Sequence, residues 1–105
     1  MIKVKIFRKS DFIYGFHIEG HAETAEYGKD IVCASVSGIS QSVLLGLKVH
    51  LKQDIKWEID EKNGAMKAEL LSNPNSETEA IMQTMLLGLR EISREYPKAI
   101  QIFEE

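Results

Sequence analysis

Residues 30–52 read DIVCASVSGISQSVLLGLKVHLK and are typical of a long helix with one apolar face. Apolar side chains recur every three or four positions, at Val32, Val36, Ile39, Val43, Leu47 and Leu51, which is the spacing of a single helix face. Asp30 is the expected N-cap, because its carboxylate can accept hydrogen bonds from the free backbone N–H groups of the first turn. The segment therefore predicts a helix over about residues 30–52 with one face in a core.

A strand pair is predicted before this helix. Residues 2–6 and 12–19 alternate apolar with polar side chains, and the polar residues 8–11 between them suit a hairpin turn. Residues 20–29 lose the pattern and include two glycines. We expect a loop there, and a loop of this length in a small domain is commonly functional.

A second strand pair and a second helix are predicted after it. Residues 55–60 and 66–70 alternate around Asn63-Gly64, a dipeptide that tolerates positive φ. Residues 76–79, Ser-Glu-Thr-Glu, match a capping box. The apolar stripe of this second helix lies at Ile81, Met82, Met85, Leu86, Leu89 and Ile92.

The end of the chain completes the predicted topology. Pro97 ends the second helix, and residues 99–103 suit a short last strand. The order is then β-β-α-β-β-α-β. It predicts an α+β fold in two layers, with a mixed sheet covered by two helices.

Length and composition set the broad class. The chain has 105 residues, enough for one domain spanning residues 1–105, and 44% hydrophobic and 28% charged residues are ordinary for a globular protein. Its 13 Lys and Arg against 16 Asp and Glu give a net charge of -3, whereas a dedicated nucleic-acid binder usually has a basic excess. Apolar runs stay short of a membrane span, and the first residues lack the apolar region of a signal peptide. We expect a cytoplasmic domain that binds neither nucleic acid nor membrane.

The sequence patterns of metal and cofactor sites are missing from the chain. Its single cysteine, Cys33, and three histidines at irregular spacing form no zinc pattern. The sequence also contains neither a P-loop nor a glycine-rich dinucleotide motif. We therefore expect no metal and no cofactor.

Four polar residues gather where the second predicted strand gives way to the first helix: His21, Asp30, Cys33 and Ser37. Cysteine chemistry needs a thiolate, which a helix N-terminus and a nearby histidinium both favour. We expect Cys33 in the first helical turn, where free N–H groups could also hold an oxyanion. Ser37 lies one turn later on the same face, within reach of the sulfur or of Asp30. Asp30 opposes a thiolate, so it either orients His21 or only caps the helix.

Each of these residues also has a structural interpretation. A lone helical cysteine is commonly a small buried hydrophobe, and a loop histidine is commonly exposed. His17 and His50 suit a strand surface and a helix end. Taken singly, the four residues do not establish a catalytic site.

Together the residues form a specific motif. Gly20-His21-Ala22 is followed by Gly28-Lys29-Asp30-Ile31-Val32-Cys33-Ala34 and then by Val36-Ser37. This pattern resembles the ribosomal-processing cysteine protease family called Prp, and the resemblance extends over essentially the whole chain in length and element order. It implies a cysteine endopeptidase with Cys33 as nucleophile and His21 as general base. Asp30 and Ser37 then occupy supporting positions.

The resemblance also implies a substrate and an assembly. Members of that family remove a short N-terminal extension from large-subunit ribosomal protein L-twenty-seven, and they form homodimers. Residues 22–27 are then expected to act as a lid gated by substrate. An extended peptide is expected to dock along a strand edge, with Tyr14, Phe16, Tyr27 and Ile31 near enough in sequence to line its groove, although core packing is the expected role of Phe16.

Two other functions stay open on the residues alone. The chain could be a non-enzymatic ribosome-associated assembly module, with Cys33 buried in a helix, or a thiol redox protein that uses Cys33. Rapid alkylation of Cys33 at pH 7 separates a protease from the first, and peptide-bond cleavage separates it from the second. A redox protein usually needs a resolving cysteine, and this chain has none.

Overall fold

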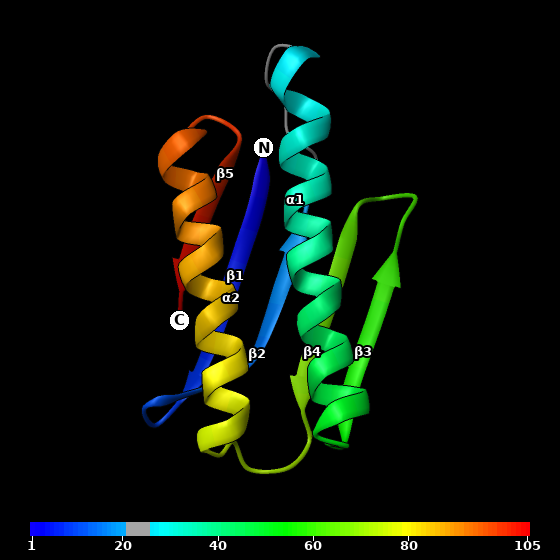
Figure 1. Ribbon diagram of the computed structural model, residues 1–105, viewed down its shortest axis with the longest axis vertical. Coiled ribbons are helices and arrows are strands. Elements are labelled where there is room, and N and C mark those ends of the chain that lie inside the picture. Colours follow the sequence, from blue (N-terminus) through cyan, green and yellow to red (C-terminus); the bar gives the residue numbers. More distant parts are fainter. Residues whose placement is uncertain (21–25) are drawn as a thin grey trace.

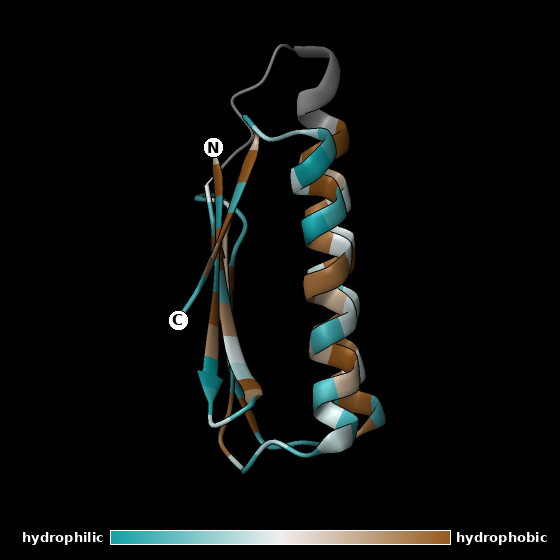
Figure 2. Cartoon of the chain, turned by 90° about the vertical axis from the view of Figure 1, so that its left-hand side faces the viewer, coloured by the Kyte–Doolittle hydropathy of each residue, from teal (hydrophilic) through white to brown (hydrophobic). Residues whose placement is uncertain are grey.

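The elements form two layers. The computed structural model describes residues 1–20 and 26–105, with side chains at 1–20 and 31–105. A five-stranded sheet forms one layer, and two helices lie side by side over one of its faces (Figures 1 and 2). In chain order the elements are β1 (Ile2–Lys9), β2 (Phe12–Glu19), α1 (Glu26–Leu45), a π-helical turn η1 (Gly46–His50), β3 (Ile55–Asp60), β4 (Ala65–Leu70), α2 (Ser76–Glu95) and β5 (Ile100–Glu104). The predicted α+β class and element order are confirmed.

The two strand pairs lie side by side in the sheet, joined through β2 and β4. The strand order is β3-β4-β2-β1-β5, and all neighbours are antiparallel except β1 and β5, which are parallel. A hairpin turn can join only antiparallel neighbours, so the other connections need long crossovers. α1 supplies the crossover from β2 to β3, and α2 supplies the one from β4 to β5. The sheet is therefore mixed, with β3 and β5 at its edges.

The core lies between the helices and the near face of the sheet. Alternate strand residues such as Val4, Ile6 and Ile18 point toward the helices and are buried. From α2 come Met82, Met85, Leu86 and Leu89, and from α1 and η1 come Val32, Val36, Leu44 and Leu47. Each such side chain contributes about 1.5–3 kcal/mol when it leaves water, so this apolar layer holds the helices on the sheet.

The first helix begins earlier than the sequence pattern predicts. α1 begins at Glu26, so Asp30 lies inside the helix and the prediction that it is the N-cap is wrong. Cys33 follows Glu26 by about two turns, so its expected place in the first turn is also wrong. Residues 26–29 are helical instead of the expected loop, whereas residues 21–25 lie outside the described part of the chain. At its other end the α-helix gives way to η1, where Leu51 N donates to Gly46 O at 2.9 Å.

The second helix is capped one residue before the predicted box. Asn75 is the N-cap, and its Oδ1 accepts from the backbone N–H groups of Glu77 at 2.9 Å and Thr78 at 3.0 Å. Thr78 Oγ1 closes the box by accepting from Asn75 N at 2.9 Å. Asn and Ser are comparable N-cap residues. The helix can therefore be capped by either Asn75 or Ser76, and the structure has Asn75. The cap at Asn75 leaves Glu79 free to bond elsewhere.

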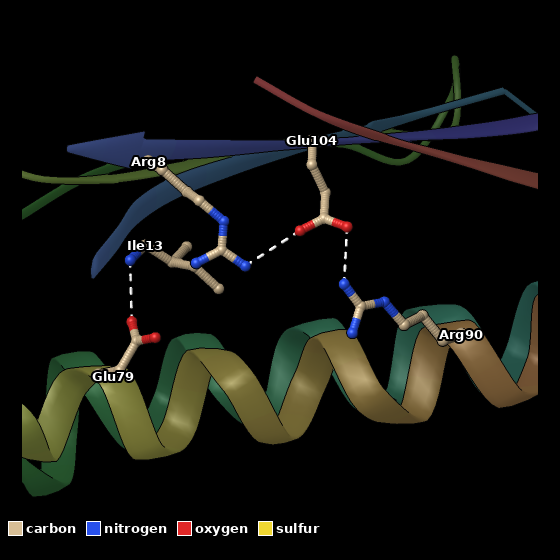
Figure 3. A network of polar contacts seen from close by, with 5 residues as sticks. All are labelled: Arg8, Ile13, Glu79, Arg90 and Glu104. Carbon is tan, nitrogen blue, oxygen red and sulfur yellow. Dashed lines mark hydrogen bonds and ion pairs between the residues drawn. The ribbon is translucent and has the colours of Figure 1, made fainter. Parts of the chain in front are cut away.

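The freed Glu79 and two arginines tie α2 to the sheet (Figure 3). Glu79 Oε1 accepts from Ile13 N at 2.8 Å, beside the irregularity in the β1–β2 pairing. Glu104 at the end of β5 accepts from Arg90 of α2 at 2.6 Å and from Arg8 of β1 at 3.0 Å. These contacts anchor both ends of α2, because one lies in its first turns and the other in its last.

The first helix is unusually apolar. Within the described part of the chain, residues 31–50 form one helical segment with a mean hydropathy of 1.4, long and apolar enough by composition to cross a membrane. A core helix passes the same test, and Val32, Val36, Leu44 and Leu47 pack in the core. The outer side of the helix also lacks charge at Ile31, Ser35, Gly38, Ser42 and Leu45. The apolar composition therefore has two sources, a core face and an uncharged outer face.

Candidate active site

A cavity of about 300 Å³ opens beside the first helix. It lies between α1, the end of β2 and the turn that joins β3 to β4. The lining residues are Ile2, Ile18, Gly20, Cys33, Val36, Ser37, Ser40, Gln41, Ile59, Asp60, Glu61, Gly64, Ala65 and Met66. The sheet thus provides an apolar floor, and the polar groups belong to α1 and to the turn.

Cys33 and Ser37 both line this cavity from α1. They are one helical turn apart, as the sequence predicts for residues on one face. Cys33 is half-buried and packs against the core, while its neighbour Val32 is fully buried. The thiol is therefore anchored by the core and also faces a cavity that a substrate can enter.

Gly20 brings the end of β2 to the same cavity. Its φ of 98° is in the left-handed region, and a Cβ at this position would clash with the carbonyl oxygen of Met1. Only glycine suits this position without strain. The next residue, His21, lies outside the described residues, as do residues 22–25 of the expected lid, whereas residues 26 and 27 of that lid belong to α1.

The hydroxyl groups of Ser37 and Ser40 form hydrogen bonds within α1. Ser37 Oγ accepts from Gln41 Nε2 at 2.6 Å, and the expected bond to Asp30 involves a side chain outside the described residues. Ser40 Oγ donates to Val36 O at 2.8 Å. The side chain of Asp30 lies outside the described residues, so its expected role in orienting His21 stays a prediction.

The far wall of the cavity was not predicted from the sequence. Asp60 Oδ2 accepts from Asn63 Nδ2 at 2.7 Å, and Oδ1 accepts from Asn63 N at 3.2 Å. These two bonds, the side-chain one foremost, hold the pKa of the Asp60 carboxyl below its ordinary value. The local signal was an Asp three residues before an Asn in a turn. That signal specifies the turn but does not reveal that the turn faces Cys33.

The described residues among those expected to line a peptide groove, Tyr14, Phe16 and Ile31, do not line this cavity. Tyr14 pairs with Phe7, with ring centroids 6.1 Å apart, and does not line the cavity. Ile31 is 52% exposed and also lies away from it. Phe16 is buried in the core, as expected, and the side chain of Tyr27 is outside the described residues.

The two described histidines, His17 and His50, lie outside the cavity. His17 lies on a strand, where burial lowers the pKa of its imidazole and Glu19 opposes that shift. His50 is exposed at the end of η1. Among the described residues, no group of three His, Cys, Asp or Glu side chains is placed to hold a metal ion.

The family model and the similar curated proteins all point to one protein family. The family described as "Cysteine protease Prp" matches residues 1–101. The ribosomal processing cysteine protease Prp of Staphylococcus aureus (strain Mu50) is 35% identical over 88 residues, which cover 81% of this chain and 80% of that protein. The Mycoplasma genitalium protein of the same name is 34% identical over 106 residues, which cover 100% of this chain and 97% of that protein.

Solved structures agree with the sequence comparison. The crystal structure of an essential ribosomal processing protease Prp from S. aureus in complex with a substrate peptide has a TM-score of 0.88 to this chain at 28% identity, covering 100% of both chains. The same protease with a covalently linked product peptide gives a TM-score of 0.87 at 29% identity, again with 100% coverage of both chains. With its fold, its cysteine beside an open cavity and these matches over nearly its whole length, the chain belongs to the Prp family of ribosomal processing cysteine proteases.

Proposed function

We propose that this protease removes the short N-terminal extension of large-subunit ribosomal protein L-twenty-seven, with Cys33 as nucleophile and His21 as general base. One observation carries the assignment of residues: Cys33 and Gly20, the residue before His21, line the same cavity. The chain contains one cysteine, so a cysteine protease mechanism has no other thiol to use. We place the reaction in the cytoplasm, where ribosomes assemble.

The proposed reaction has two stages. His21 takes the proton from the Cys33 thiol, and the thiolate attacks the scissile carbonyl carbon to form a tetrahedral oxyanion. The oxyanion collapses, the C–N bond breaks, and His21 gives its proton to the leaving amine. A water molecule then attacks the thioester carbon, the C–S bond breaks, and the extension leaves as a carboxylic acid while the thiol regains its proton.

The position of Cys33 changes how its thiol is activated. The helix dipole acts mainly on the first turn, and Cys33 lies about two turns beyond Glu26. The backbone N–H groups around Cys33 are bonded within the helix, so they are not the oxyanion donors expected from the sequence. His21 therefore becomes the main group that can generate the thiolate.

The proposed function is tested with the precursor of the ribosomal protein from the same organism. Wild-type protein is expected to give a single cut after the extension, detected by mass spectrometry, and the C33A and H21A variants are expected to leave the precursor intact. H17A is the matched control, because His17 lies on a strand outside the cavity. An uncut precursor together with slow alkylation of Cys33 at pH 7 would instead favour a non-enzymatic assembly module.

We also propose that the protease is a homodimer joined through the outer side of α1. Ile31, Gly38 and Leu45 recur every seven residues there, with Ser35 and Ser42 between them, which is the spacing of a helix-pairing seam. Ile31 is 52% and Leu45 57% exposed, and a Cβ added at Gly38 would contact nothing within 4 Å. The packing of the chain itself therefore does not account for a glycine at position 38.

The dimer is tested by the mass of the protein in solution. Wild-type protein is expected to elute as a dimer in size exclusion with light scattering, and L45E is expected to give a folded monomer. L71E is the control, since Leu71 is 60% exposed but lies after β4. A monomeric wild type, or a dimer that survives L45E, would reject this interface.

A further inference from the structure

Within the described part of the chain, the cavity beside Cys33 has charged side chains on one wall only. Among the described residues that line it, the charged ones are Asp60 and Glu61, at the point where β3 enters its turn toward β4. The sheet residues are apolar, and those of α1 are uncharged. Lys62 belongs to the same turn but does not line the cavity. Among the described lining residues, no cation offsets the negative charge of this wall.

Asp60 gives this wall a fixed shape. Both of its carboxylate oxygens accept hydrogen bonds from Asn63, as described above. Those bonds favour the ionised carboxylate. Gly64 adopts a φ of 63° and completes the turn. Asp60 is thus a positioning residue that holds its neighbour Glu61 at the cavity.

Glu61 is the carboxylate available to a ligand. Its side chain is exposed, and within the described part of the chain its carboxylate has no hydrogen-bond or ion-pair partner. A carboxylate in this state suits an ammonium or a guanidinium group, because charge-assisted hydrogen bonds are stronger than neutral ones. A peptide bound next to Cys33 would meet Glu61 in the same cavity.

We propose that Glu61, held by the turn that Asp60 and Asn63 fix, selects substrates with a Lys or Arg close to the scissile bond. This inference rests on the proposed function, since it takes Cys33 as the attacking group. In that reaction the scissile bond joins the extension to the mature ribosomal protein. A protein that packs against ribosomal RNA needs Lys and Arg to neutralise phosphates. The selected basic residue is therefore expected on the mature side of the bond.

The charge of the cavity is measured without any peptide. Cys33 is modified with two methanethiosulfonate reagents of similar size, one bearing a trimethylammonium and one a sulfonate, and the two rates are compared by intact mass. The ratio of cationic to anionic rates is expected to fall about fivefold in E61K, near the upper end of what one exposed charge contributes. E58K is the matched control, because Glu58 lies on β3 opposite Lys67 and does not line the cavity.

Substrate selection is measured with peptides that contain the extension and the first residues of the mature protein. Each Lys or Arg near the cleavage point is changed in turn to Gln and to Glu, and kcat/KM is measured with wild type, E61K and E58K. With wild type, one such position is expected to lose about fivefold on change to Glu. With E61K the preference at that position is expected to reverse, which a purely structural role for Glu61 would not produce.

The outcomes separate this inference from the proposed function. If peptides are cut but the charge preference is the same in wild type and E61K, the inference is overturned and the proposed function stands. If no peptide is cut while the reagent ratio falls in E61K and not in E58K, the proposed function fails and the cation-selective cavity stands. A reagent ratio that is unchanged in E61K overturns the inference whatever the peptides show.

Discussion

The two helices cover the same sheet but hold to it differently. α2 packs closely on β2 and β5, buries four large apolar side chains, and is tied to the strands by Glu79 and Arg90. α1 packs mainly against α2 and η1, and its middle turns border an open cavity. The two helices lie side by side in Figure 1. The α2 side therefore stabilises the fold, and the α1 side leaves room for substrate. This division predicts that stability and activity can be changed separately.

The largest effect on stability is expected from the buried face of α2. Leu89 is fully buried, so L89A leaves a cavity and is expected to lower the free energy of unfolding by about 2–5 kcal/mol. Urea unfolding at 25 °C measures it. L87A is the matched control, because Leu87 is two residues away and 53% exposed. Equal losses in both variants would contradict the packing described here.

At Asp30, on the α1 side, we expect a change in activity without a change in stability. Asp30 lies inside α1 and is not its N-cap, so D30N is expected to leave the unfolding midpoint nearly unchanged. If Asp30 orients His21, turnover of the ribosomal precursor is expected to fall at least about 100-fold, the scale of a positioned acid–base group. Unchanged turnover would show that Asp30 does not orient His21.

The smallest effect is expected from the ion pairs that tie β5 to α2. Arg90 first, and then Arg8, hold the pKa of the Glu104 carboxyl below its ordinary value. A carboxyl with a lowered folded-state pKa stabilises the protein above its unfolded pKa, and that stability is lost as pH falls through the folded-state pKa. The pairs are partly exposed, so they contribute at most about 1 kcal/mol.

The test of these pairs is a comparison of E104Q with wild type at two pH values. E104Q is expected to be less stable than wild type at pH 7. The difference is expected to shrink at a second, acidic pH, because Glu104 is protonated as pH falls through its lowered folded-state pKa. E95Q is the control, because Glu95 is exposed at the end of the same helix. A stability difference that is the same at both pH values would mean that the charge of Glu104 is not the cause.

The sequence sufficed for the element order because each element has its own periodicity. Alternation at residues 55–60 and 66–70 and the three-to-four spacing of α2 are local signals, and all three elements are present. The start of α1 was missed because residues 26–29 carry no apolar repeat and include Gly28. The α2 cap was shifted by one residue because Asn75 and Ser76 are both good caps.

The site could be predicted only in part. Cys33 and Ser37 share a face because helical spacing places them there, whatever the rest of the chain does. Asp60 and Glu61 reach the same cavity because the turn between β3 and β4 lies beside the middle turns of α1. That approach depends on the strand order of the whole sheet. Local sequence patterns do not encode it, so the acidic wall became visible only in the folded chain.

The most direct test of the account is to locate the covalent bond to the substrate. A peptide of the extension, ending in a chloromethyl ketone at the cleavage point, is incubated with the protease, which is then digested and mapped by mass spectrometry. The account predicts one adduct per chain, at Cys33, formed rapidly in wild type and slowly in H21A. An adduct at another residue, or equal rates in wild type and H21A, would contradict the pairing of Cys33 with His21.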